Sequence, residues 1–172
     1  MHVRDRRPGL TAKVEGAPIL IAGAGRMGGA LIAGWRAAGV AADQILIRDP
    51  APGDVARTAV AAGAALNPEN SALRRARSVI LAVKPAGWRE AAAELAPLLA
   101  EDAIVVSTLA GVGLAAVQDA FPAHPVARAM PTTAVAIGKG PISLIAADAA
   151  ARARAMALFA PLGEVVELAG EV

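Results

Sequence analysis

Three glycines at fixed spacing are the residues of this chain with the clearest chemical use. Gly23, Gly25 and Gly28 follow the pattern G-x-G-x-x-G directly after the apolar run 18–22. In that pattern the first glycine permits a tight turn, the second lets a pyrophosphate approach the backbone, and the third lets the next helix pack closely on the strand. The N-terminus of such a helix also offers unpaired N–H groups to phosphate oxygens. The stretch therefore predicts a dinucleotide site.

The residues on either side of the turn support this interpretation. Residues 18–22 (PILIA) form an unbroken apolar run, which is typical of a strand buried on both faces of a parallel sheet. Residues 27–38 place apolar side chains on one helical face, and Gly39 ends that pattern. A second glycine pattern at 111–116 has no strand directly before it, so there we expect a structural turn that begins a later helix. A purely structural turn stays the alternative for the first pattern as well.

Asp49 is the candidate contact to an adenosine ribose. It follows the predicted strand 44–48 and lies 21 residues after Gly28, where a Rossmann fold places a carboxylate that accepts hydrogen bonds from the ribose hydroxyls. Such a carboxylate favours NAD because it repels a 2′-phosphate, whereas Arg48 and Arg57 could attract that phosphate. The sequence leaves NAD and NADP open. It also leaves open a role for Asp49 as the cap of the next helix.

Lys84 follows another long apolar run, residues 78–83 (SVILAV). Ligands of a doubly wound sheet bind outside the carboxyl ends of the strands, so we expect Lys84 at the rim of that crevice. A cation there suits a phosphate or a substrate carboxylate, and an ordinary surface lysine is the alternative. The loop 107–111, which follows the predicted strand 103–107, should lie in the same crevice.

Strand and helix patterns alternate along the chain after residue 17. The other predicted strands are 64–66, 126–130, 141–146 and 163–168, and the other predicted helices are 54–62, a brief helix that ends at 77, 87–99, 114–121 and a helix from an Asp148 cap to 159. This alternation predicts an α/β fold: one Rossmann domain, residues 18–172, with a doubly wound, mostly parallel sheet and helices on both faces. Residues 1–17 carry charges but no apolar h-region, which predicts a flexible N-terminal extension.

Composition limits the classes of partner. Hydrophobic residues make up 56% of the chain, but no apolar run approaches the roughly 18 residues that span a bilayer, so we expect a soluble protein without membrane contact. The formal charge of +2, with two tryptophans, two phenylalanines and no tyrosine, argues against a nucleic-acid partner. The chain has no cysteine and two histidines, from which we expect no metal site and a cytoplasmic location.

Four motifs taken together resemble pyrroline-5-carboxylate reductase. They are the glycine turn 23–28 (GAGRMG), 82–85 (AVKP), 107–112 (STLAGV) and 128–133 (RAMPTT). The first motif is shared with many dehydrogenases, whereas the other three in this order are much more specific. The agreement runs from about residue 18 to the end of the sequence.

The resemblance implies an oxidoreductase that binds NADPH or NADH and reduces the C=N bond of 1-pyrroline-5-carboxylate, the last step of proline biosynthesis. It implies that the glycine turn holds the pyrophosphate, that residues 48–49 meet the adenosine ribose, and that the loops 82–85 and 108–110 line the ribose and nicotinamide. The implied cofactor-binding residues are Gly23, Ala24, Gly25, Arg26, Met27, Gly28, Arg48, Asp49, Asn70, Ala82, Val83, Lys84, Pro85, Thr108, Leu109 and Ala110. A protonated imine is already electrophilic, so positioning supplies much of the acceleration and no catalytic acid or base is assigned.

The sequence departs from the family pattern in three places. Thr132 stands where the family usually has Asn, and Arg26 stands where it has Asn or Gln. The helical dimerisation domain that follows the reductase domain in the family is absent from these 172 residues. We therefore expect the isolated chain to bind a nicotinamide nucleotide but to reduce the imine slowly or not at all, and to form a homo-oligomer only if that domain is present. The alternatives are a domain like that of a 3-hydroxyacid dehydrogenase and a non-catalytic nucleotide-binding module or remnant.

Overall fold

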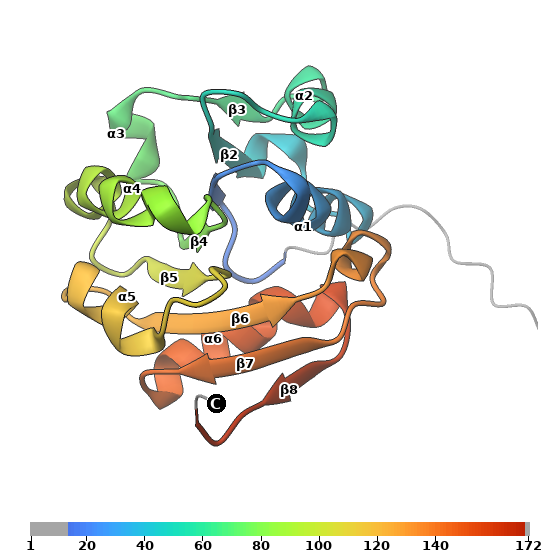
Figure 1. Ribbon diagram of the computed structural model, residues 1–172. Helices are drawn as coiled ribbons and strands as arrows, with labels where there is room; N and C mark the ends of the chain where they lie inside the picture. Colours follow the sequence, from blue (N-terminus) through green and yellow to red (C-terminus); the bar gives the residue numbers. More distant parts are fainter. Residues whose placement is uncertain (1–13, 171–172) are drawn as a thin grey trace, which may run out of the picture.

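The apolar runs predicted as strands lie side by side in one mixed sheet. The computed structural model describes residues 14–170, and in this part of the chain the strand order is β3-β2-β1-β4-β5-β6-β7-β8 (Figure 1). Every neighbouring pair is parallel except β6 with β7. The strands are β1 Ile19–Ala22, β2 Ile45–Arg48, β3 Ala65–Leu66, β4 Ser78–Leu81, β5 Ile104–Ser107, β6 Val126–Pro131, β7 Ile142–Ala146 and β8 Val165–Glu167. The predicted doubly wound, mostly parallel α/β sheet is confirmed.

Helices cover both faces of this sheet, and each face buries its own apolar cluster. One cluster joins alternate residues of the strands to α1 (Arg26–Ala37), α2 (Asp54–Ala61) and α6 (Ala149–Phe159). The other joins the remaining strand residues to α3 (Asn70–Leu73), α4 (Trp88–Leu95) and α5 (Leu114–Ala120). Every residue of β1 and β4 is buried, and since side chains alternate across a strand, both faces of the sheet must be covered to bury them.

Short 3₁₀ segments complete the connections. They are η1 Ala42–Gln44, η2 Pro85–Gly87, η3 Ala96–Leu98, η4 Thr133–Ile137 and η5 Ala160–Leu162. The predicted helix 87–99 begins one residue later, at Trp88, and its predicted end is wrong: α4 stops at Leu95, and Pro97 lies in the 3₁₀ turn that follows. Proline lacks an N–H donor and its ring clashes with the carbonyl one turn earlier, so it ends the α-helical ladder. The Asp148 cap is confirmed, because its Oδ1 accepts a hydrogen bond from the Ala151 N–H at 2.7 Å.

The segment before β1 is described only in part. Residues 1–13 of the predicted extension lie outside the described residues. Val14 is buried against the first apolar cluster, and the Ala17 N–H donates to the Val14 carbonyl. Between residues 14 and 170, no helix is both long and apolar enough to cross a bilayer.

Trp35 connects the first helix to the C-terminal part of the fold. Its side chain is fully buried on α1, and its indole N–H donates a hydrogen bond of 2.9 Å to the Leu158 carbonyl on α6. Its ring also meets Phe159 edge to face, with 5.7 Å between the centroids. This contact fixes α1, and with it the turn before α1, against an element far away in the sequence.

We predict that Trp35→Phe lowers the free energy of unfolding by about 2 kcal/mol, because it opens space in the core and leaves the Leu158 carbonyl without its donor. Urea unfolding followed by circular dichroism measures the change. The control is Trp88→Phe in the other apolar cluster, where the Trp88 ring packs under the Arg89 guanidinium, 4.7 Å from the ring centroid, and Phe keeps an aromatic ring for that contact. Equal losses for the two variants would contradict the role given to the Trp35 hydrogen bond.

Candidate nucleotide-binding site

The strands at the centre of the sheet end at the same level. Ala22 pairs with Arg48 on one side and with Leu81 on the other, and Leu81 pairs in turn with Ser107. These four residues are the last of β1, β2, β4 and β5. The loops that follow them must therefore leave from one edge of the sheet.

Hydrogen bonds join these loops just beyond the strand ends. The Gly23 N–H donates to the Arg48 carbonyl at 2.9 Å, and the Ala82 N–H donates to the Ala22 carbonyl at 2.8 Å. The Thr108 hydroxyl and backbone N–H both donate to the Leu81 carbonyl, at 2.9 and 3.0 Å. β1 lies between β2 and β4, where the chain order of the strands reverses. This is the switch point at which open α/β sheets bind their ligands.

The three positions 23, 25 and 28 of the first turn require or admit glycine for different reasons. Gly23 has φ +92°, and an added Cβ there would meet the Ala82 carbonyl oxygen at 2.5 Å. A Cβ on Gly28 would clash with the Gly23 carbonyl oxygen, so only glycine lets α1 start this close to β1. A Cβ on Gly25 would meet nothing within 4 Å, and Gly25 is exposed. Gly23 and Gly28 therefore serve the fold, whereas Gly25 leaves its backbone open to a ligand.

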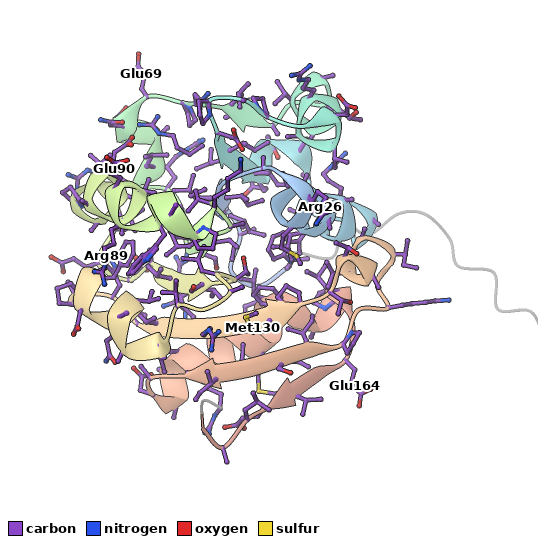
Figure 2. All side chains as sticks on the ribbon, viewed as in Figure 1. Arg26, Glu69, Arg89, Glu90, Met130 and Glu164 are labelled. Carbon is purple, nitrogen blue, oxygen red and sulfur yellow. The ribbon has the colours of Figure 1, made fainter. Side chains whose placement is uncertain are left out.

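The start of α1 is electrostatically positive. Its N-cap is Gly25, no side chain caps it, and its first turn contains no acidic residue. The first N–H groups of a helix have no acceptor within the helix and carry the positive end of its dipole. Arg26, exposed at this end of α1, adds a full charge (Figure 2). Together these features favour an anion at the turn.

Asp49 is held between the glycine turn and the loop after β3. Its Oδ2 accepts a hydrogen bond from the Ala24 N–H at 2.6 Å, and its Oδ1 accepts one from the Ala51 N–H at 2.7 Å. The Asn67 side chain bonds both the N–H and the carbonyl of Asp49, at 2.9 and 2.8 Å. The residue that caps α2 is Gly53. The alternative in which Asp49 caps that helix is therefore wrong.

The guanidinium group of Arg48 is anchored by several groups. Its Nη2 and Nε donate to the Glu94 carboxylate at 2.7 and 3.2 Å. Its Nη2 also donates to Asn70 Oδ1 at 2.9 Å, and its Nη1 donates to the Pro68 carbonyl at 3.0 Å. Asn70 thus contributes to the candidate site by holding the Arg48 side chain and does not line either cavity itself.

Two adjoining cavities lie along this edge of the sheet. The one beside the glycine turn measures about 450 Å³ and is lined by Gly23, Gly25, Arg48, Asp49, Pro50, Ala51, Ala82, Val83, Lys84 and Gly87. The other measures about 350 Å³ and is lined by Ala22, Arg48, Asp49, Pro50, Asn67, Val83, Ala91, Glu94 and Leu95. Both volumes fall within the range of small-molecule sites. Arg48 and Asp49 lie on the wall shared by the two cavities.

The structure brings part of the predicted site together. The predicted residues that line the cavities are Gly23, Gly25, Arg48, Asp49, Ala82, Val83 and Lys84. The remaining predicted residues, Ala24, Arg26, Met27, Gly28, Asn70, Pro85, Thr108, Leu109 and Ala110, line neither cavity. Leu109 is buried in the second apolar cluster, so its side chain belongs to the core.

Sequence reasoning missed several lining residues. Asn67 is not among the predicted site residues, yet it has φ +44°, a left-handed conformation that Asn tolerates well, and its side chain fixes Asp49. The Asn-Pro pair at 67–68 was a usable signal for this turn. Glu94 gave no signal, because its role depends on a contact with Arg48, 46 residues away in the chain.

The fold and this edge of the sheet define a dinucleotide-binding Rossmann-type domain. Comparison with known proteins identifies the family to which the domain belongs. Residues 18–111, more than half of the chain, match the family described as NADP oxidoreductase coenzyme F420-dependent. The chain belongs to this family.

Its curated relatives and a solved structure agree with the predicted resemblance. The chain is 38% identical over 108 residues to the pyrroline-5-carboxylate reductase of a Synechocystis species, covering 60% of this chain and 40% of the relative. It is 36% identical over 132 residues to that of Pseudomonas aeruginosa, covering 74% and 48%. The structure of the Plasmodium falciparum pyrroline carboxylate reductase with NADP bound superposes with a TM-score of 0.78 at 18% identity, covering 91% and 59%. The resemblance to the N-terminal domain of these reductases is confirmed, and the chain spans less than half the length of the two curated relatives.

We predict that alanine affects the free energy of unfolding strongly at one glycine of the turn and hardly at all at another. Gly28→Ala should lower the free energy of unfolding by about 3 kcal/mol, because α1 must move off β1 to admit the Cβ. Gly25→Ala should change it by less than about 0.5 kcal/mol, because the Cβ enters open space. Chemical unfolding measures both changes, with Gly170→Ala as control since a Cβ there also meets nothing within 4 Å. A stable Gly28→Ala protein would contradict the close approach described here.

Proposed function

We propose that this chain supplies the coenzyme-binding half of an NAD(P)H-dependent reductase that converts 1-pyrroline-5-carboxylate to proline. The observation that carries the proposal is the exposed Gly25 backbone at the positive end of α1, opening onto the cavity of about 450 Å³. The sequence similarity to two pyrroline-5-carboxylate reductases supports the choice of substrate. A 3-hydroxyacid dehydrogenase is the competing enzyme class, and the substrate assays described at the end of this subsection distinguish it from a pyrroline-5-carboxylate reductase.

The residues present fit a dinucleotide. In the proposed complex the N–H groups at the start of α1 hold the diphosphate, because no side chain caps this helix and Arg26 is its first residue. Lys84, which lines the same cavity and is exposed, supplies a second cation. Asp49 supplies a carboxylate for the adenosine ribose at the wall between the cavities. The loop 82–85, tied to β1 by the Ala82 N–H, forms the side toward the nicotinamide ribose.

The proposed reduction of the imine needs no particular acid or base among the side chains of this chain. When bound, the reduced nicotinamide supplies a hydride to the imine carbon, and the imine nitrogen keeps a proton to give the secondary amine. The task of this chain is to hold the coenzyme at a fixed place and to keep its reactive ring at the edge of the sheet. The ends of β4 and β5, joined through Thr108 and Leu81, provide a rigid base for that ring.

We predict that the 172-residue protein binds nicotinamide dinucleotides and that Gly25→Ala lowers the affinity by about tenfold or more, because its Cβ enters the space that the diphosphate needs. Isothermal titration with NADH and NADPH measures both proteins. Gly170→Ala is the matched control and should bind as the unaltered protein does. Failure of the unaltered, folded protein to bind either nucleotide would overturn the proposed function and favour a module without this role.

The substrate is tested separately. With saturating coenzyme, the protein should consume NAD(P)H with 1-pyrroline-5-carboxylate and should not reduce NAD(P)⁺ with 3-hydroxyisobutyrate, because an imine and a hydroxyacid need different chemistry at the reacting carbon. We expect the 172-residue chain to reduce the imine much more slowly than the pyrroline-5-carboxylate reductase of Pseudomonas aeruginosa, of which it spans 48%. Coenzyme binding together with hydroxyacid oxidation would support the competing class.

A further inference from the structure

The cation that could recognise a 2′-phosphate is already engaged in this fold. All three guanidinium nitrogens of Arg48 donate hydrogen bonds, to Glu94, Asn70 and the Pro68 carbonyl. The shortest of them, 2.7 Å, goes to the Glu94 carboxylate on α4. The Arg48 side chain keeps only 25% of its surface exposed. It therefore lines the cavity wall with its charge paired and its donors directed toward α4 and the loop after β3.

The carboxylate next to it faces the same space. Asp49 lines both cavities, and its own hydrogen bonds come from the neutral backbone N–H groups of Ala24 and Ala51. Those bonds hold the negative charge in place without cancelling it. Arg57, the other basic residue considered for this role, donates its Nε to the Pro52 carbonyl and lines neither cavity. The wall thus presents a fixed negative charge where the adenosine ribose is placed.

We propose that Glu94 determines the coenzyme that this site prefers: by holding Arg48 against α4, it leaves Asp49 to face the ribose, so that the site takes NADH in preference to NADPH. The inference rests on the proposed function, since it concerns the same dinucleotide site. A free pair of ribose hydroxyls donates hydrogen bonds to a carboxylate, whereas a 2′-phosphate at the same place meets repulsion.

Glu94 is the residue whose removal changes this balance. It lies in the last turn of α4 and is the carboxylate paired with Arg48 among the ion pairs of residues 14–170. Without Glu94, Arg48 keeps two neutral acceptors, Asn70 Oδ1 and the Pro68 carbonyl. Its positive charge then becomes available at the wall of the cavity for charge-assisted hydrogen bonds to a phosphate. Alanine is a strong helix former, so the substitution keeps α4 intact.

The test compares NADH and NADPH binding to the 172-residue protein and to Glu94→Ala by isothermal titration. The unaltered protein should bind NADH at least about tenfold more tightly than NADPH, and Glu94→Ala should tighten NADPH binding about tenfold while NADH binding changes by less than about twofold. The gain should shrink with added salt because Arg48 is partly exposed. In the double variant Glu94→Ala with Arg48→Gln the gain should disappear.

A second ion pair provides the matched control. Arg152 and Glu167 are joined at 2.8 Å on α6 and β8, outside both cavities. Glu167→Ala removes a similar pair and should leave both affinities unchanged. Tighter binding of NADPH than NADH by the unaltered protein, or equal changes of the two affinities in Glu94→Ala, would overturn this inference and leave the proposed function standing. Absence of binding of either coenzyme would overturn both.

Discussion

The close approach of α1 to β1 is the constraint on which the rest of this structure depends. The helix begins at Arg26, four residues after the strand ends at Ala22, and its third residue lies against the carbonyl of Gly23. A Cβ at either Gly23 or Gly28 would drive backbone into backbone. Only because both positions are glycine does the positive end of α1 point at the level where β1, β2 and β4 stop together.

Charge is then divided between two parts of the same crevice. Beside the glycine turn lie the positive end of α1, exposed Arg26 and, on the loop after β4, Lys84, and this positive charge favours an anion such as a diphosphate. The wall shared by the cavities has the fixed carboxylate of Asp49, while the charge of Arg48 is paired with Glu94. A ligand that matches these charges has an anionic group at one end and hydroxyl donors at the other, as a dinucleotide has and a simple phosphate has not. The Ala24 N–H, bonded to Asp49, joins the two parts.

The sequence predicted what depends on local pattern. Apolar runs such as 18–22 and 78–83 identified the buried strands, and glycine spacing identified the turn, because each signal is contained within a few adjacent residues. What it missed depends on contacts across the fold. Asn67 and Glu94 reach the site from the loop after β3 and from α4. The contact of Asn67 with Asp49 and that of Glu94 with Arg48 join distant parts of the chain, so no local pattern predicts either of them. The 3₁₀ segment 133–137, which packs beside α1, was missed for the same reason.

The central claim is that backbone N–H groups at the start of α1, just beyond the Gly23–Gly25 turn, form the cradle for a diphosphate at the switch point of the sheet. A crystal structure of the protein with bound NADH tests it most directly. The account predicts diphosphate oxygens within hydrogen-bonding distance of those N–H groups, with the adenosine ribose hydroxyls on the Asp49 carboxylate. A dinucleotide bound elsewhere, with the turn left empty, would contradict it.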